Sequence, residues 1–252
     1  MKRVLVVCAG ALLWGAAKVP AEHALFTARA QHHLNPVPLD LTLREQIGQL
    51  GFVAAFSGFR SVVADFLFIQ AHIAWERTEW SRVLLLFQQV TTLQPRSVLF
   101  WDMAAWHMAW NASAAALNDP AQPRLALRIK AQREYFDLGR DFLERGIRNN
   151  PDRPQLYEAL ARLYRDKYKD HARAAQYFEK AAEKPGAPNY ARRFAAYELS
   201  YVEGREQEAY EQLRRLYLSS EKERLPTLIS RLKFLEGKLN IPPDQRIPDA
   251  VR

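Results

Sequence analysis

The chain has 252 residues, of which 48% are hydrophobic, and it carries a formal net charge of +8 and a single cysteine. Its basic residues are interspersed with acidic ones, which favours a solvated surface over a nucleic-acid-binding stripe, so we expect no nucleic acid partner. The lone Cys8 excludes an internal disulfide and a cysteine-based metal site, and we expect neither a metal nor a cofactor.

Residues 1–21 have the order of a membrane-targeting segment. The basic start MKR is followed by an apolar run from Val4 to Ala17. As a helix this run would span roughly 21 Å, less than a hydrocarbon core of roughly 30 Å. We predict an uncleaved signal anchor, with a cleaved signal peptide and a buried first helix as the alternatives.

The charge at the N-terminus sets the expected topology. Basic residues before an apolar segment stay in the cytoplasm. We therefore predict a single-pass protein of the cytoplasmic membrane with its body on the periplasmic side. Residues 22–40 are polar and are interrupted by Asn35-Pro36-Val37-Pro38, so they are predicted to be a linker.

The segment from Asp152 to Pro185 has the clearest internal order in the chain. Apolar residues recur at i, i+3, i+4 and i+7 in two successive runs, which predicts two packed amphipathic helices. These residues are Leu156, Tyr157, Leu160, Ala161 and Tyr164, then Ala174, Ala175, Phe178, Ala181 and Ala182. The pattern resembles the tetratricopeptide repeat (TPR), a helix-turn-helix unit of about 34 residues. The resemblance implies an all-α fold, an α-solenoid of such repeats, and a role in binding other proteins.

The same register extends to both sides of this unit. Counting back from Pro95 predicts packing positions at Leu67, Ala71, Ala74, Val83, Phe87 and Val90. We predict a TPR-like domain over residues 41–240 and a tail over 241–252. Within the domain we place repeats near 64–97, 98–152, 153–187 and 188–220 and a capping helix at 226–239.

The second predicted repeat departs from the pattern by its length. It carries an insertion of roughly twenty residues over the usual repeat. The segment from Ser113 to Pro123 has turn chemistry, so we expect it to interrupt the helices and delay the second one. Insertions in solenoids map to loops on one face.

A narrower resemblance rests on longer strings. GFRSVVADFLFIQAHIAWERTEW, which starts at Gly58, and FWDMAAWHMAWNAS, which starts at Phe100, are similar to a poorly characterised family of bacterial membrane-anchored TPR-like proteins. That resemblance implies a location in the cell envelope and carries no catalytic residues with it.

The first helix of each repeat lines the concave groove in TPR proteins, so its inner side supplies the candidate contacts. We predict a partner-binding site made of Asp65, His72, Trp75, Asp102, Trp106, Trp110, Asn111, Glu158, Arg162 and Arg165. Tryptophan and arginine can anchor a buried interface with a polypeptide segment. The alternative is that the tryptophans belong to the core, which is the commoner place for them.

No motif of a known reaction is present, so an enzyme is not expected. The sequence lacks a glycine-rich phosphate loop, a GxSxG elbow and an HExxH pair. We predict a non-catalytic scaffold or adaptor of the bacterial cell envelope. The alternative is a periplasmic helical enzyme or binding protein that acts on a glycan or small ligand through groove carboxylates such as Asp65 and Asp102.

Overall fold

The computed structural model describes residues 59–248 together with Pro20 and Ala24, and every regular element in residues 59–248 is a helix. The predicted all-α class is therefore confirmed for this part of the chain. The predicted signal anchor, the linker and the start of the repeat domain lie outside the described residues, apart from those two positions. No helix among the described residues is long and apolar enough to cross a membrane.

The first described helix pair is α3 (Arg60–Glu76) and α4 (Trp80–Leu93). The two helices lie against each other, joined by a short link in which Thr78 takes a left-handed conformation with φ of 57°. All six packing positions predicted for this pair are buried. Ala71 and Ala74 let the helix backbones approach, and Phe87 fills the space beside them.

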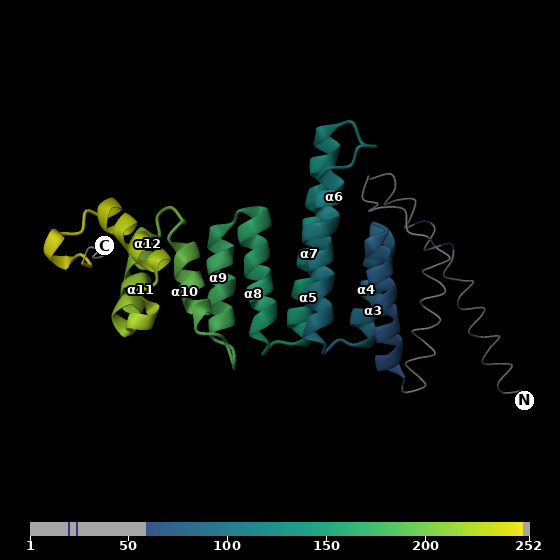
Figure 1. Ribbon diagram of the computed structural model, residues 1–252, viewed down its shortest axis with the longest axis horizontal. Coiled ribbons are helices and arrows are strands. Elements are labelled where there is room, and N and C mark those ends of the chain that lie inside the picture. The colour runs from purple at the N-terminus through teal and green to yellow at the C-terminus, as the bar shows by residue number, and fades with distance from the viewer. Residues whose placement is uncertain (1–19, 21–23, 25–58, 249–252) are drawn as a thin grey trace, which may run out of the picture. The chain divides into compact units, whose positions relative to one another are not determined.

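The next pair is longer and forms what we call the extended hairpin, residues 98–149. Its first arm is one helical run made of α5 (Val98–Trp106), the π-helical η1 (His107–Ala112) and α6 (Ser113–Leu117). Its second arm is α7 (Leu125–Asn149). Figure 1 shows the two arms side by side, and all three parts of the first arm contact α7.

The predicted interruption at Ser113–Pro123 is wrong for its first half. Residues 113–117 are helical, and the turn is confined to residues 118–124. The reason is local, since three alanines, which favour a helix, follow Ser113, and its hydroxyl is satisfied within the helix by donating to the carbonyl of Ala109 at 2.6 Å. The inserted residues therefore lengthen both helices of one pair instead of forming a loop.

Two glycines allow the arms of the extended hairpin to approach closely. A Cβ atom at Gly139 would lie 2.7 Å from the Cβ of Ala109, and one at Gly146 would lie 2.8 Å from Cγ of Trp101. Trp101 is 2% exposed, and its indole donates to the carbonyl of Pro95 at 2.9 Å. The large indole thus occupies the space that the missing side chain of Gly146 leaves.

The compact hairpin, residues 154–182, is the unit that most resembles a TPR in sequence. It consists of α8 (Pro154–Leu163), the π-helical η2 (Tyr164–Tyr168) and α9 (His171–Ala182). Asp170 caps α9 by accepting from the backbone N–H of Arg173 at 2.8 Å. The predicted core residues of this hairpin are buried, except for Ala182, which is half-buried.

The remaining helices are α10 (Tyr190–Leu199), α11 (Glu206–Ser219) and α12 (Pro226–Lys238). Their shared core is built mainly from Ala196, Leu199, Ala209, Leu213, Leu228, Leu232 and Leu235. Two short 3₁₀ turns follow α11 and α12, η3 (Glu221–Glu223) and η4 (Pro243–Gln245). The described part of the tail packs back on α12, because the N–H of Ile247 donates to Glu236 at 2.7 Å.

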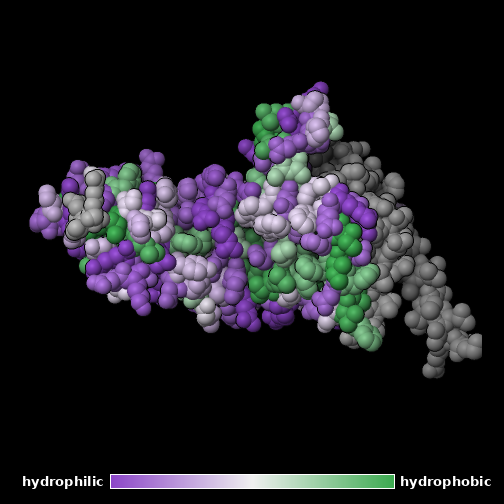
Figure 2. Space-filling model, in the orientation of Figure 1, coloured by the Kyte–Doolittle hydropathy of each residue, from purple (hydrophilic) through white to green (hydrophobic). Residues whose placement is uncertain are grey.

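Helix α3 has a second apolar face. Phe59, Val62, Phe66 and Ile69 are each more than half exposed, and their spacing puts them on one side of the helix. Figure 2 shows them as a green strip over α3. Only one of the two apolar faces of α3 is therefore buried.

Candidate partner-binding site

The ten predicted contact residues come from the first helices of three successive pairs, and we call them the first-helix face. Asp65, His72 and Trp75 lie on α3; Asp102 and Trp106 on α5; Trp110 and Asn111 on η1; Glu158 and Arg162 on α8; and Arg165 on η2. Seven of them lie in one of two connected groups, an aromatic one and a charged one. Trp110 contacts Lys167, and Asp65 and Arg165 belong to neither group.

The aromatic group is arranged around His107. The ring centroid of His107 lies 5.4 Å from that of Trp75 and 5.0 Å from that of Trp106. His72 joins the group through Trp75, at 4.9 Å. Asn111 lies 3.3 Å from Nδ1 of His107, one π-helical turn further along the chain. Four predicted residues thus meet at a histidine that the sequence analysis did not single out.

His107 belongs to the interior and not to the binding surface. It is 2% exposed and also packs against Phe87 of α4, at 5.3 Å between centroids. Burial, together with the smaller effect of the nearby His72, lowers its pKa from 6.5 to about 4. The imidazole is therefore neutral at pH 7 and supports the tryptophans that surround it.

Trp106 is the exposed member of the aromatic group. Its side chain is 42% exposed, whereas Trp75 and Trp110 are half-buried and Trp101 is buried. The alternative that the tryptophans belong to the core therefore applies fully to Trp101 and least to Trp106. An indole supported by a buried ring and open on its outer side can anchor a partner.

The charged group lies one turn before Trp106 and continues onto the compact hairpin. Burial raises the pKa of the Asp102 carboxyl, and the guanidinium of Arg162 acts in the opposite direction. Arg162 lies 3.7 Å from Glu158, and Glu158 accepts a hydrogen bond from the hydroxyl of Tyr190 at 2.8 Å. The carboxylate of Asp102 makes no hydrogen bond or ion pair with a described residue, and the charge that acts on it is that of Arg162.

The two π-helical segments meet beside this surface. The ammonium of Lys167 in η2 lies 5.1 Å from the ring centroid of Trp110 in η1 and 5.6 Å from that of Phe136. Each π-helical segment inserts an extra residue into its turn and so rotates the side chains that follow. Such segments occur frequently at functional sites. Here they bring a cation of one hairpin onto the aromatic rings of the previous one.

Two predicted residues belong neither to these groups nor to the contact of Trp110 with Lys167. Asp65 is exposed, and its carboxylate makes no hydrogen bond or ion pair with a described residue. Arg165 is bound to its neighbour Asp166 at 2.7 and 3.2 Å. That hydrogen bond raises the pKa of Arg165 more than burial lowers it. Arg165 is thus already engaged, and Asp65 stays a prediction without a structural neighbour.

A carboxylate pair of the kind that hydrolyses glycosides would need two acids at one cleft. Asp102 lies within the electrostatic reach of Arg162, and Asp65 is on another helix. Neither of the two cavities between helices α9, α10 and α11 is lined by these acids. No group of three or more metal-ligating side chains occurs in the described part of the chain. The glycan alternative therefore has no observation in its favour.

Sequence analysis missed three residues of the site, namely His107, Lys167 and Tyr190. His107 carried one usable signal, because it stands four residues before Asn111 on the same helix. Lys167 was hidden because a π-helical segment shifts the register on which helical-wheel reasoning depends. Tyr190 lies on α10 and donates to Glu158 on α8, and the apolar spacing within one helix does not predict a contact between two helices.

The described part of the chain is all-helical, and its helices pack as successive pairs. No family model and no curated protein matches the chain. Among solved structures, it is similar to the one titled "Functional Characterization of Pseudomonas Aeruginosa pilF". The two share 15% sequence identity over 78% of this chain and 98% of that one, with a TM-score of 0.26. At that score the likeness carries no conclusion about fold or function.

Proposed function

We propose that the protein is a non-catalytic, TPR-like scaffold that binds a segment of a partner protein on its first-helix face. The observation that carries the proposal is the exposed Trp106, which packs against the buried His107 and lies one turn after Asp102, beside the charged group. Rigid aromatic side chains with a polar surround are the usual anchors of polypeptide interfaces. Arg162 extends the same surface onto the next helix pair.

The chemistry of this surface indicates the kind of segment that it would take. Asp102 and Trp106 are four residues apart on α5, so they lie on the same side of the helix. A lysine or arginine side chain can lie over an indole while its charge meets a carboxylate. Arg162, which is 43% exposed, offers the complementary contact to an acidic group. A partner segment with a basic residue followed or preceded by an acidic one fits this arrangement.

The proposal includes a location in the bacterial cell envelope. It rests on the basic start and apolar run of residues 1–21, which support a signal anchor in the cytoplasmic membrane. The repeat domain would then lie on the periplasmic side, where the anchor keeps it close to membrane-bound partners and raises their effective concentration. Fractionation of cells that express the full chain tests the location. Recovery in the soluble periplasm, with an N-terminus at Glu22, would contradict the anchor.

The binding surface is tested with a double variant of the full chain. Trp106→Ala with Arg162→Glu removes the anchor and reverses one charge, so proteins crosslinked to the tagged chain in cells should be lost. Removal of one interface anchor alone typically costs 1–4 kcal/mol, or about tenfold to several hundredfold in affinity. Arg214→Glu on α11 is the matched control, because Arg214 is exposed and lies on a second helix.

Circular dichroism of the double variant distinguishes a surface from a core. The proposal predicts a helical signal equal to that of the unmodified chain and loss of the crosslinked set. Loss of the helical signal would instead show that Trp106 is needed for folding, and the assignment of the surface would be wrong. An unchanged set of crosslinked proteins would also contradict it.

A further inference from the structure

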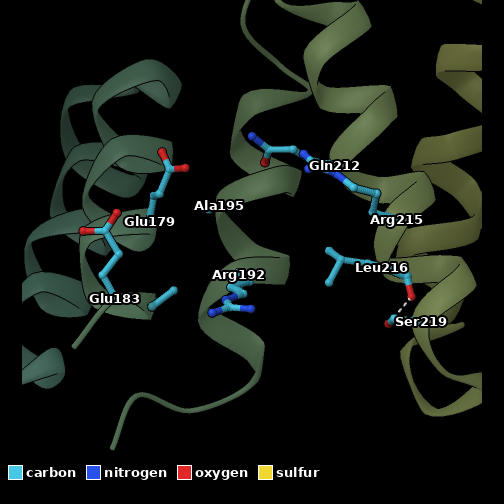
Figure 3. A pocket seen from close by; sticks show the side chains of 9 residues that line it. Glu179, Glu183, Arg192, Ala195, Gln212, Arg215, Leu216 and Ser219 are labelled. Carbon is cyan, nitrogen blue, oxygen red and sulfur yellow. Dashed lines mark hydrogen bonds between the residues drawn. The ribbon is translucent and has the colours of Figure 1, made fainter. Parts of the chain in front are cut away.

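A second concave surface lies away from the first-helix face, between helices α9, α10 and α11. A cavity of about 510 Å³ is lined there by Glu179 and Glu183 of α9, Arg192 of α10 and Arg215 of α11. Figure 3 shows the two carboxylates on one side and the two guanidinium groups beyond them. None of the ten predicted contact residues lines this cavity.

The cavity continues into a neighbouring one and forms a groove. The second cavity, of about 390 Å³, shares Glu179, Ala195 and Gln212 with the first. Together they follow α9 and α11, and we call them the α9–α11 groove. Its floor is the side of α10 that carries Ala195 and Leu199, where the small alanine leaves space above the helix.

Four of the charged side chains in this groove, those that line the first cavity, are not neutralised by each other. The side chains of these residues, namely Glu179, Glu183, Arg192 and Arg215, form no hydrogen bond or ion pair with any described residue. Other charged side chains of the groove are paired, since Arg205 bonds Glu208 and Arg173 lies 3.4 Å from Asp170. Two free carboxylates and two free guanidinium groups in one groove present both signs of charge to a ligand at the same time.

The length of the groove indicates a linear ligand. It is lined on α9 from Ala172 to Glu183, a distance of roughly 17 Å at 1.5 Å per residue. An extended polypeptide covers that distance with about five residues. The amides of Gln176 and Gln212 line the groove between the charged positions, where they can donate to and accept from a peptide backbone.

We propose that the α9–α11 groove is a second docking surface, which takes an extended polypeptide segment carrying both a basic and an acidic side chain. The basic side chain meets Glu179 and Glu183, and the acidic one meets Arg192 and Arg215. A segment with only one sign of charge would leave half of these groups without a partner and would meet repulsion from them. The groove therefore selects for a pair of opposite charges.

The test is a binding titration of fluorescent seven-residue peptides against the full chain in a mild detergent. The peptides have a threonine and alanine backbone with one lysine and one glutamate, in both orders. Peptides with two lysines or two glutamates are the comparison. The proposal predicts that one order of the mixed-charge peptide binds at least about tenfold more tightly than either single-charge peptide, and that added salt weakens this binding.

Variants locate the binding on the protein. Glu179→Lys with Glu183→Lys, and separately Arg215→Glu, should each reduce affinity for the mixed-charge peptide by about tenfold, whereas Arg214→Glu and Trp106→Ala should leave it unchanged. Glu179→Gln with Glu183→Gln provides the same test if the lysine variant loses its helical signal.

Equal binding of all peptides would overturn the proposal, as would an equal effect of Arg214→Glu and Arg215→Glu. A loss with Trp106→Ala would place the peptide on the first-helix face, which separates this proposal from the previous one.

Discussion

The extended hairpin and the compact hairpin solve the same packing problem with different side chains. In the extended hairpin, α5 and α7 approach closely because Gly139 and Gly146 have no side chain, and Trp101 occupies the space. In the compact hairpin, Ala161 and Ala181 are the small residues, and Phe178 is the large one. Both combinations fill the space between the helices. The glycine and tryptophan of the extended hairpin tolerate substitution less, because a Cβ atom at either glycine would lie within 3 Å of a neighbouring side chain.

The hairpins also divide the candidate site between them. The extended hairpin contributes Trp106, Trp110 and the buried His107, whereas the compact one contributes Arg162 and Lys167. The two sets meet through the contact of Lys167 with Trp110 and through the electrostatic effect of Arg162 on Asp102. A change in either hairpin should therefore affect the site, but the extended one should respond more strongly.

The largest expected effect on stability comes from His107, which is buried in the extended hairpin. Its pKa is about 4 in the folded protein and 6.5 ordinarily, so the unfolded chain takes up the proton first as the pH falls. Stability that is present above pH 6.5 is then lost between pH 6.5 and 4, by up to about 3 kcal/mol. Urea unfolding at several pH values should show this loss reduced in His107→Gln. Identical pH profiles would mean that His107 is not buried as a neutral group.

The next test replaces a glycine with alanine at two positions, and we expect opposite effects on the free energy of unfolding. Gly146→Ala places a Cβ against Trp101 and should destabilise the protein by about 1–3 kcal/mol. Gly237→Ala on α12 meets nothing within 4 Å and should stabilise it by up to about 1 kcal/mol, because alanine favours a helix. Thermal unfolding of the two variants measures both. A stabilising Gly146→Ala would show that α5 and α7 are further apart than described.

The smallest expected effect on stability comes from two lysines that lie over aromatic rings, one between the hairpins and one within the compact hairpin. Lys167 contacts Trp110 and Phe136, and burial lowers its pKa. Lys180 on the compact hairpin lies over Tyr177 at 4.8 Å. Because a desolvated cation–π contact is the stronger kind, Lys167→Gln should cost about 1 kcal/mol in unfolding free energy and Lys180→Gln less than about 0.5 kcal/mol. If the two variants lost the same unfolding free energy, the contact of Lys167 with Trp110 would not be stronger than that of Lys180 with Tyr177.

Much of the fold followed from the spacing of apolar residues. Leu67, Ala71 and Ala74 lie on one face of α3 at helical spacing, and that periodicity leads directly to burial against α4. Pro154 begins α8 at the helix position where proline is tolerated. Turn chemistry was less reliable, since Ser113 continues the helix through a bond to the carbonyl of Ala109. A serine in sequence looks the same in both roles.

The site was harder to predict than the fold, for two reasons. Helical-wheel reasoning assumes a constant register, and the π-helical η1 and η2 break it where Trp110 and Lys167 lie. Exposure is also a property of the whole packing, so the sequence alone could not separate the exposed Trp106 from the buried Trp101. The α9–α11 groove escaped prediction because three helices from two pairs build it.

The most direct test of the binding surface is site-specific photo-crosslinking in cells. A photoreactive residue replaces Trp106 in one variant of the full chain and Arg214 in another, and mass spectrometry identifies the crosslinked proteins. The first-helix face predicts a small, reproducible set of partners from position 106 and none of them from position 214. The same partners from both positions, or none from position 106, would contradict the proposal that this face binds a partner.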